Sequence, residues 1–100
     1  MDDGKIILTD NGKKVLTYLQ NEAKNSGNNL DMVGKDIGEA TAVTGIYFVL
    51  DWLVRRGLVE RGTPVERPFT NNKGETKPKM YQTYRITQFG LLFNIEKKEN

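Results

Sequence analysis

Hydrophobic residues recur at three- and four-residue steps in the segment from about Thr44 to Arg56, which predicts a helix with one apolar face. The spacing places one group of residues on its buried side: Val43, Ile46, Val49, Leu50 and Leu53. Arg55 and Arg56 put positive charge at the C-terminal end of this helix, where the helix dipole favours it. Gly57 can adopt the left-handed conformation that ends a helix, and a strand is expected to begin at Leu58.

A longer amphipathic segment lies near the N-terminus. Thr9 is a good N-cap for a helix that continues to about Lys24, and residues 25–29 are turn formers that predict a loop. The residues expected to face inward on this helix are Val15, Leu16, Leu19 and Ala23. We therefore expect this helix to be the scaffold on which later elements pack.

A short second helix is expected between these two, from about Val33 to Ala40. Asp31 is a candidate cap at its start, and Ile37 and Ala40 are expected to face inward. A brief turn then leads into the helix described first. The order is that of a helix-turn-helix followed by a strand.

The segment from Thr63 to Met80 is rich in Pro, Asn, Gly, Thr and Lys, and a strand-like sequence flanks it on each side. We predict that Leu58 to Arg61 pairs with Tyr81 to Ile86, and that a long loop with its turn at residues 71–74 joins them. The return strand alternates, with one face formed by Met80, Gln82, Tyr84 and Ile86 and the other by Tyr81, Thr83 and Arg85. We expect the last two residues of the first face to be buried.

Thr87 can cap a final helix from Gln88 to about Lys98. Its apolar side chains lie on more than one side, so a monomer of this size would bury only some of them. The surplus predicts a homodimer in which this helix packs with apolar residues near the N-terminus. The expected dimer interface consists of Ile6, Ile7, Phe89, Leu91, Leu92 and Ile95.

Three short sequences resemble one family of proteins. LVRRGLVER, at residues 53–61, resembles the end of the recognition helix and the first wing strand of MarR-like winged-helix regulators. YRITQFG, at residues 84–90, resembles the sequence that closes the wing in MarR-like and PadR-like regulators, and LTDNGKKVL, at residues 8–16, repeats its Thr-capped helix start.

The resemblance implies an α+β fold in which residues 1–100 form a single winged-helix domain. This domain would comprise a three-helix helix-turn-helix core, a two-stranded wing with a long loop at about 58–86, and a C-terminal helix at about 88–98. The implied function is that of a dimeric, sequence-specific double-stranded DNA-binding protein that regulates transcription.

The side of the third helix opposite the core carries the candidate base-reading residues. Helical spacing places Thr44, Phe48, Asp51, Trp52 and Arg55 there, and Phe48 is suited to a thymine methyl group. Basic side chains of the wing are expected to contact phosphates. The full set of expected DNA-contacting residues is Lys35, Thr44, Gly45, Tyr47, Phe48, Asp51, Arg55, Arg67, Asn72, Lys73, Lys77 and Lys79.

Two large aromatic residues on that side leave a second interpretation open. Phe48 and Trp52 are one helical turn apart, and an exposed apolar patch usually marks an interface. They would then pack beneath the wing or, together with Tyr47, against a protein partner. In the latter case the chain would be a winged-helix protein-interaction module.

The charge of the chain is unevenly distributed. The net charge is +2, but residues 1–50 have five basic and seven acidic side chains, whereas residues 51–100 have ten basic and six acidic ones. The positive half contains the end of the recognition helix and the wing. This asymmetry is typical of nucleic-acid binding.

The chain contains no cysteine and no histidine. The commonest general base, the nucleophile pairs that need it and most transition-metal sites are therefore missing, so we expect no enzyme, no metal and no cofactor. No segment has the length of an apolar membrane span, and the N-terminal sequence lacks the features of a signal peptide. We expect a cytoplasmic protein that does not associate with a membrane.

Overall fold

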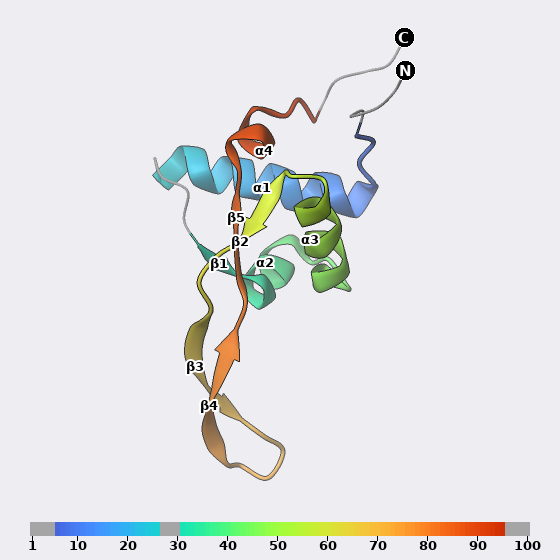
Figure 1. The fold of residues 1–100 in the computed structure, drawn as a ribbon. Helices are drawn as coiled ribbons and strands as arrows, with labels where there is room; N and C mark the ends of the chain where they lie inside the picture. Colours follow the sequence, from blue (N-terminus) through green and yellow to red (C-terminus); the bar gives the residue numbers. More distant parts are fainter. Residues whose placement is uncertain (1–5, 27–30, 96–100) are drawn as a thin grey trace.

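Helices and short strands are interspersed along residues 6–26 and 31–95, the ranges that the computed structural model describes (Figure 1). The elements are α1 (Asp10–Ser26), β1 (Met32–Val33), α2 (Gly34–Thr41), α3 (Ile46–Arg55), β2 (Val59–Arg61), β3 (Val65–Thr70), β4 (Thr76–Tyr81), β5 (Thr83–Ile86) and α4 (Gln88–Leu92). The predicted α+β class is confirmed, with four helices and small antiparallel sheets in these ranges.

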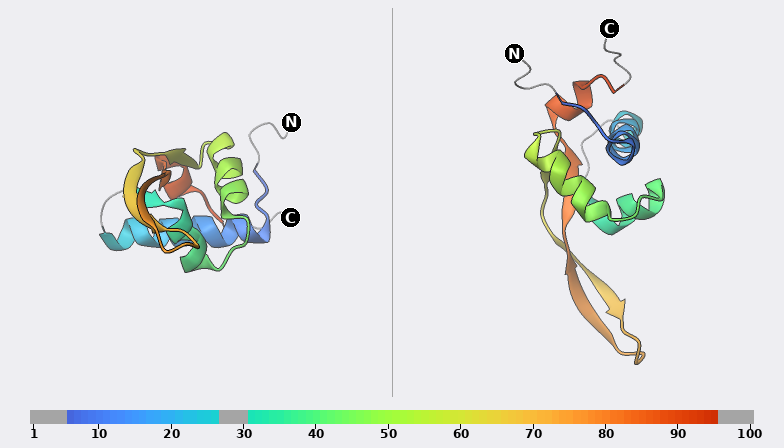
Figure 2. Two further views of the ribbon diagram at one scale, coloured as in Figure 1. Left: turned by 90° about the horizontal axis from the view of Figure 1, so that it is seen from below. Right: turned by 90° about the vertical axis from the view of Figure 1, so that its right-hand side faces the viewer.

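The hydrophobic core lies where α1, α2 and α3 meet the sheet (Figures 1 and 2). It contains Leu8, Val15, Leu16, Leu19, Ile37, Val43, Ile46, Leu50, Leu53, Leu58, Val59, Tyr84 and Ile86. The predicted inward faces of α1 and α3 are confirmed, although Ala23 and Val49 are only half-buried. Ala40, expected to face inward, is exposed because the last turn of α2 borders an open groove against α1.

Capping by Thr9 sets the start of α1. The Thr9 hydroxyl accepts a hydrogen bond from the backbone N–H of Gly12 at 3.0 Å, so this prediction is confirmed. The helix continues to Ser26, however, and residues 25 and 26 are therefore helical rather than part of a loop. The remainder of that predicted loop, residues 27–29, lies outside the described residues.

Asp31 does not cap α2. The residue at the N-cap position is Val33, which makes no side-chain capping bond. Met32–Val33 forms β1, and this strand separates Asp31 from the start of the helix. The Asp31 carboxylate instead accepts a hydrogen bond from the Thr63 backbone N–H at 3.3 Å and lies 3.6 Å from an Arg85 nitrogen, which joins this segment to the sheet.

The central sheet has three antiparallel strands in the order β1-β5-β2. Its register pairs Met32 with Tyr84 on one side of β5 and Val59 with Ile86 on the other. The predicted pairing of the strand after α3 with the return strand is confirmed. The sequence did not indicate β1, because two residues are too few to show alternation.

The segment between these paired strands forms a second hairpin, contrary to the predicted long loop. Strands β3 and β4 pair from Val65 with Tyr81 to Thr70 with Thr76. The turn lies where it was predicted: the Asn71 side-chain oxygen accepts from the N–H groups of Lys73 and Glu75 at 2.8 and 3.0 Å. The hairpin projects from the helical core and makes the molecule elongated, with extents of 55 × 27 × 20 Å (Figure 1).

The expected alternation along the return strand breaks at Gln82, between β4 and β5. Tyr84 and Ile86 are buried as predicted, but Tyr81 and Thr83 are buried as well. The Gln82 side-chain nitrogen donates to the Gly62 and Thr83 carbonyls at 3.0 Å each, which secures the break. One period-two pattern cannot continue across it, and Met80 accordingly lies exposed on the hairpin.

The final helix is shorter than predicted. Thr87 caps α4 as expected, since its hydroxyl accepts from the Gly90 N–H at 2.9 Å. The helix ends at Leu92 because Phe93 is extended, and the Gln20 side-chain nitrogen donates to the carbonyls of Gly90 and Phe93 at 2.9 Å each. The predicted helix is therefore confirmed for Gln88–Leu92 and wrong for residues 93–95, and the rest of it, to Lys98, lies outside the described residues.

Candidate functional site

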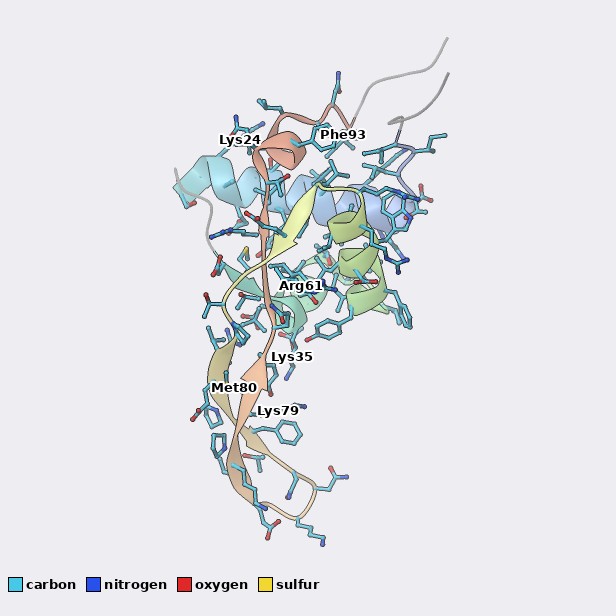
Figure 3. The ribbon with its side chains drawn as sticks, viewed as in Figure 1. Lys24, Lys35, Arg61, Lys79, Met80 and Phe93 are labelled. Carbon is cyan, nitrogen blue, oxygen red and sulfur yellow. The ribbon has the colours of Figure 1, made fainter. Side chains whose placement is uncertain are left out.

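The register of β3 and β4 divides the projecting hairpin into two unlike faces, because side chains alternate along each strand. The basic face consists of Val65, Arg67, Phe69, Lys77, Lys79 and Tyr81. The opposite face, here called the proline face, consists of Glu66, Pro68, Thr70, Thr76, Pro78 and Met80. All three cationic side chains of the two strands thus share one face, and their one acidic side chain lies on the other. Figure 3 shows Lys79 and Met80 on opposite sides of the hairpin.

Aromatic rings support the lysines of the basic face. The Lys79 ammonium lies 4.6 Å from the centre of the Phe69 ring and 5.5 Å from that of Tyr81. Both distances are within the range of cation–π attraction. Lys77 is the cross-strand partner of Phe69. The rings cover the aliphatic part of this face while its charges stay exposed to solvent.

A pair of prolines limits how the hairpin can associate through its edges. Pro68 and Pro78 lie directly opposite each other in the register. Opposite residues in an antiparallel pair either hydrogen-bond to each other or point their backbone polar groups outward. Two prolines cannot hydrogen-bond to each other because neither has an N–H, so this pair is of the second kind. The N–H groups that proline lacks are therefore ones that would point outward from the two edges. Each edge therefore lacks one donor at the same level, which disfavours the addition of another strand.

An ion pair joins the basic face to α2. Two Arg67 nitrogens donate to the two Asp36 oxygens at 3.0 and 2.7 Å. Hydrogen bonding from Arg67, helped by the charges of Arg67 and Lys35, lowers the pKa of the Asp36 carboxyl, and Asp36 in turn raises the pKa of Arg67. Lys35 therefore lies in the same charged region as Arg67, although the two are far apart in sequence.

The start of α3 presents an exposed aromatic side chain. Gly45 is left-handed, with φ of 70°, and the helix begins at Ile46 rather than at the predicted Thr44. Phe48, in the first turn, is 85% exposed. Tyr47 is half exposed, and its ring centre lies 6.5 Å from that of Tyr84 in the sheet. Phe48 therefore does not pack beneath the hairpin, contrary to one of the expected alternatives.

The C-terminal half of α3 differs because its charged groups already have partners. The Asp51 carboxylate binds Arg55 at 2.7 Å and Arg61 of β2 at 2.5 Å. Hydrogen bonding from Arg55 is the largest cause of a lowered pKa at Asp51, and the charge and hydrogen bonding of Arg61 add to it. Arg55 and Asp51, both expected to contact DNA, are thus engaged with each other.

Trp52 does not share an exposed surface with Phe48. Its side chain is half-buried against the core, and the Arg56 guanidinium lies 4.8 Å from the centre of its ring. The expectation that Trp52 points outward is wrong because its side chain packs against the core, where burial of its apolar surface is favourable. The exposed aromatic surface of α3 reduces to Phe48 and part of Tyr47.

The residues expected to contact DNA fall into three groups. One group, Lys35, Arg67, Lys77 and Lys79, lies around the basic face and its junction with α2 (Figure 3). A second, Thr44, Gly45, Tyr47, Phe48, Asp51 and Arg55, belongs to α3 and the turn before it. Asn72 and Lys73 lie in the turn that joins β3 and β4, at the end of the same hairpin. Most of these residues thus belong to two surfaces, the basic face of the hairpin and the start of α3.

Sequence reasoning missed three residues that organise these surfaces, namely Asp36, Arg61 and Phe69. Alternate residues of a strand share a face, so a strand assignment for residues 67–69 and 77–81 would have placed Phe69 on the same face as the basic residues. No local signal indicates the Asp36–Arg67 pair, because 31 residues separate its members.

The residues expected at a dimer interface divide evenly. Ile6, Leu91 and Ile95 pack against the core of their own chain. Ile7, Phe89 and Leu92 remain exposed, by 75%, 50% and 71%. Phe89 and Leu92 belong to α4, which lies at the end of the molecule opposite the β3–β4 hairpin (Figures 1 and 2).

Residues 6–26 and 31–95 contain no group of three or more acidic side chains placed to hold a metal ion. Within the same ranges, no single helix has the length and hydropathy needed to cross a membrane; only α2 and α3 taken together would meet that test, and they are bent by 112° at the turn between them.

Comparison with known proteins gives no relative from which a role could be transferred. The sequence matches no protein-family model, and no curated protein and no solved structure is significantly similar to it.

Proposed function

We propose that this chain is a winged-helix protein that binds double-stranded DNA and regulates transcription. The observation that carries the proposal is the segregation of every cation of β3 and β4 onto one face of a projecting hairpin. The order α1-β1-α2-α3-β2, followed by a hairpin and the return strand β5, is the order of a helix-turn-helix with a wing. A basic projection beside a helix-turn-helix is the arrangement expected of a duplex-DNA reader.

In this proposal the start of α3 and the basic face of the hairpin have different roles. The start of α3, with Thr44, Tyr47 and Phe48 exposed, enters the major groove. Lys77 and Lys79 of the basic face lie along the phosphate backbone or in the minor groove, where they supply affinity that does not depend on base sequence.

Three arginines near the surface enter such a complex already paired to carboxylates. Arg55 and Arg61 bind Asp51, and Arg67 binds Asp36. All of these groups are partly exposed, so each ion pair is weak and a phosphate can compete for the guanidinium. The carboxylates therefore orient the arginines and also moderate non-specific binding.

The test is fluorescence anisotropy of labelled mixed-sequence duplex DNA at two salt concentrations. The variant with Lys73, Lys77 and Lys79 changed to Ala is compared with one in which Lys13, Lys14 and Lys24 of α1 are changed to Ala. The two variants have the same net charge. For each hairpin lysine that contacts a phosphate, we expect the slope of log K against log salt to become shallower by about 0.9.

Equal loss in the two triple variants would mean that binding follows total charge and that the hairpin lysines have no special role. Absence of salt-sensitive binding at micromolar protein would reject the proposed function.

A second candidate function is protein binding through the start of α3. The exposure of Phe48, together with that of Tyr47, favours it, because large exposed apolar side chains mark interfaces. Phe48→Ala would then abolish capture of the protein partner while leaving DNA affinity unchanged. An unchanged partner interaction in that variant would reject this candidate.

We also propose that the chain forms a homodimer through Ile7, Phe89 and Leu92. Pairing at the end opposite the hairpin turn leaves both hairpins accessible, and two-fold symmetry would present two binding surfaces to two half-sites. Light scattering should give the mass of a dimer for the native chain and that of a monomer for Phe89→Asp with Leu92→Asp. A monomeric native chain at tens of micromolar would exclude the dimer.

A further inference from the structure

The start of α3 has an unusual chemical composition for a surface that reads bases. Guanine is most often recognised by Arg or Lys, adenine by Asn or Gln, and cytosine by an acidic side chain. Residues 44–48 carry none of these and instead expose a hydroxyl at Thr44, part of the Tyr47 ring and nearly all of Phe48.

The charged groups further along α3 are poorly placed to supply what is missing. Arg55 shares the Asp51 carboxylate with Arg61, and Arg56 lies over the Trp52 ring. A guanidinium held by a carboxylate has fewer donors for guanine, and a carboxylate that already accepts from two guanidiniums is a poor acceptor for cytosine. The group on α3 that is most available for a new contact is therefore the apolar ring of Phe48.

The backbone around Phe48 allows a close approach. The turn that precedes it contains the left-handed Gly45, where a Cβ would meet the Phe48 ring at 3.8 Å and otherwise open space. Phe48 has the largest exposed fraction of the large hydrophobic side chains in the described residues. Leaving this ring in water costs free energy, so covering it in a complex is favourable.

We infer that Phe48 determines base specificity by contacting the C5-methyl group of thymine, so that this protein prefers duplexes with A·T pairs at the α3 contact. The thymine methyl is the one apolar group that the four bases present in the major groove. A basic hairpin is compatible with the same preference, because A-tracts narrow the minor groove and strengthen its attraction for Lys and Arg. The inference rests on the proposed DNA binding and assigns its specificity.

The experiment measures the affinity of the full chain for four duplexes of equal length by fluorescence anisotropy. The first is rich in A·T pairs, and the second replaces each of its thymines by deoxyuridine, which removes only the methyl groups. The third is rich in G·C pairs, and the fourth replaces its cytosines by 5-methylcytosine, which adds a methyl group at the corresponding position in the major groove.

We expect the replacement of thymine by deoxyuridine to weaken binding about fourfold for each methyl group contacted, the effect of uncovering one buried methyl. Cytosine methylation should strengthen binding to the G·C duplex. Phe48→Ala should bind the thymine and deoxyuridine duplexes equally, whereas Phe48→Leu should retain part of the discrimination. Met80→Ala, an exposed apolar change on the proline face of the hairpin, should behave like the native chain.

Equal affinity of the native chain for the thymine and deoxyuridine duplexes would overturn the inference while leaving DNA binding intact. Discrimination that survives in Phe48→Ala would assign methyl recognition to another residue and would equally overturn it. If Phe48→Ala changes no DNA affinity, the ring is available for a protein partner instead. No binding to any of the four duplexes would reject the proposed function itself.

Discussion

The three-stranded sheet and the projecting hairpin are both antiparallel, but different forces hold them together. In β5, three of four residues are buried beneath the helices. In β3 and β4, every residue except Tyr81 is exposed. Burial stabilises the sheet, whereas the hairpin depends on its turn, its cross-strand pairs and the Arg67–Asp36 contact with α2. Packing therefore constrains the residues of the sheet, whereas burial places little constraint on those of the hairpin.

The largest expected effect is on the free energy of unfolding. It tests whether a substitution in the buried core costs more stability than one in the exposed hairpin. Leu53 is fully buried, so Leu53→Ala should lower the free energy of unfolding by about 2–5 kcal/mol through lost burial and a new cavity. Met80, on the proline face, is 60% exposed, and Met80→Ala should change that free energy by no more than about 0.5 kcal/mol. Urea denaturation of both variants measures the difference, and similar losses would mean that the hairpin contributes to the cooperative core.

Removal of the hairpin should separate folding from binding. Replacing residues 66–80 by Asn-Gly keeps Val65 opposite Tyr81 and supplies a favourable hairpin turn. We expect the helical circular dichroism to persist and DNA affinity at low salt to fall by roughly tenfold or more, since several phosphate contacts are lost. Loss of the helical signal would show that the core needs the hairpin in order to fold.

A substitution of Asp51, whose carboxylate pairs with two arginines, is expected to raise DNA affinity rather than lower it. Asp51→Asn removes a negative charge that competes with phosphate for Arg55 and Arg61. DNA affinity should rise a few-fold, and its salt dependence should become steeper by up to about 0.9 per arginine released. Asp10→Asn, which makes the same charge change on α1, is the control. A weaker complex in Asp51→Asn would mean that orienting the arginines matters more than releasing them.

The smallest expected effect is on the stability of the folded chain at low pH. The pKa values of Asp36 and Asp51 are lowered in the folded chain, chiefly by hydrogen bonds from Arg67 and Arg55. A carboxyl whose pKa is lower in the folded state stabilises that state above its unfolded pKa of about 4, and this contribution disappears as pH falls through the folded value. Thermal melts should therefore show a small loss of stability below about pH 4, reduced in Asp36→Asn with Asp51→Asn. An unchanged acid profile would show that these exposed pairs add nothing.

How far the sequence predicts this fold depends on the range of each interaction. The faces of α1 and α3 were predictable because helical periodicity is local, and the Thr9 and Thr87 caps lie beside the helices that they start. The hairpin was not recognised as paired strands because prolines and turn formers hide a register that only cross-strand contacts establish. Its content of basic residues was evident from the sequence, but their collection on one face was not.

On α3, too, local spacing could be predicted from the sequence, whereas contacts with distant residues could not. Helical spacing predicted the exposure of Phe48 correctly and that of Trp52 incorrectly, since a large ring can tilt toward the core from a position at the edge of a helical face. The pairing of Asp51 with Arg55 follows the local four-residue step, whereas the contribution of Arg61 requires the strand to return beside the helix.

The side chain of Gln20 ties the end of α4 to the middle of α1 through the carbonyls of Gly90 and Phe93. In a dimer formed through α4, this one amide would fix the angle between the pairing surface and the helical core of each subunit. Under the proposed DNA binding, that angle would set the separation of the two α3 helices, and so the number of base pairs between the centres of the two half-sites. A residue far from any nucleotide would thereby help to define the length of the operator.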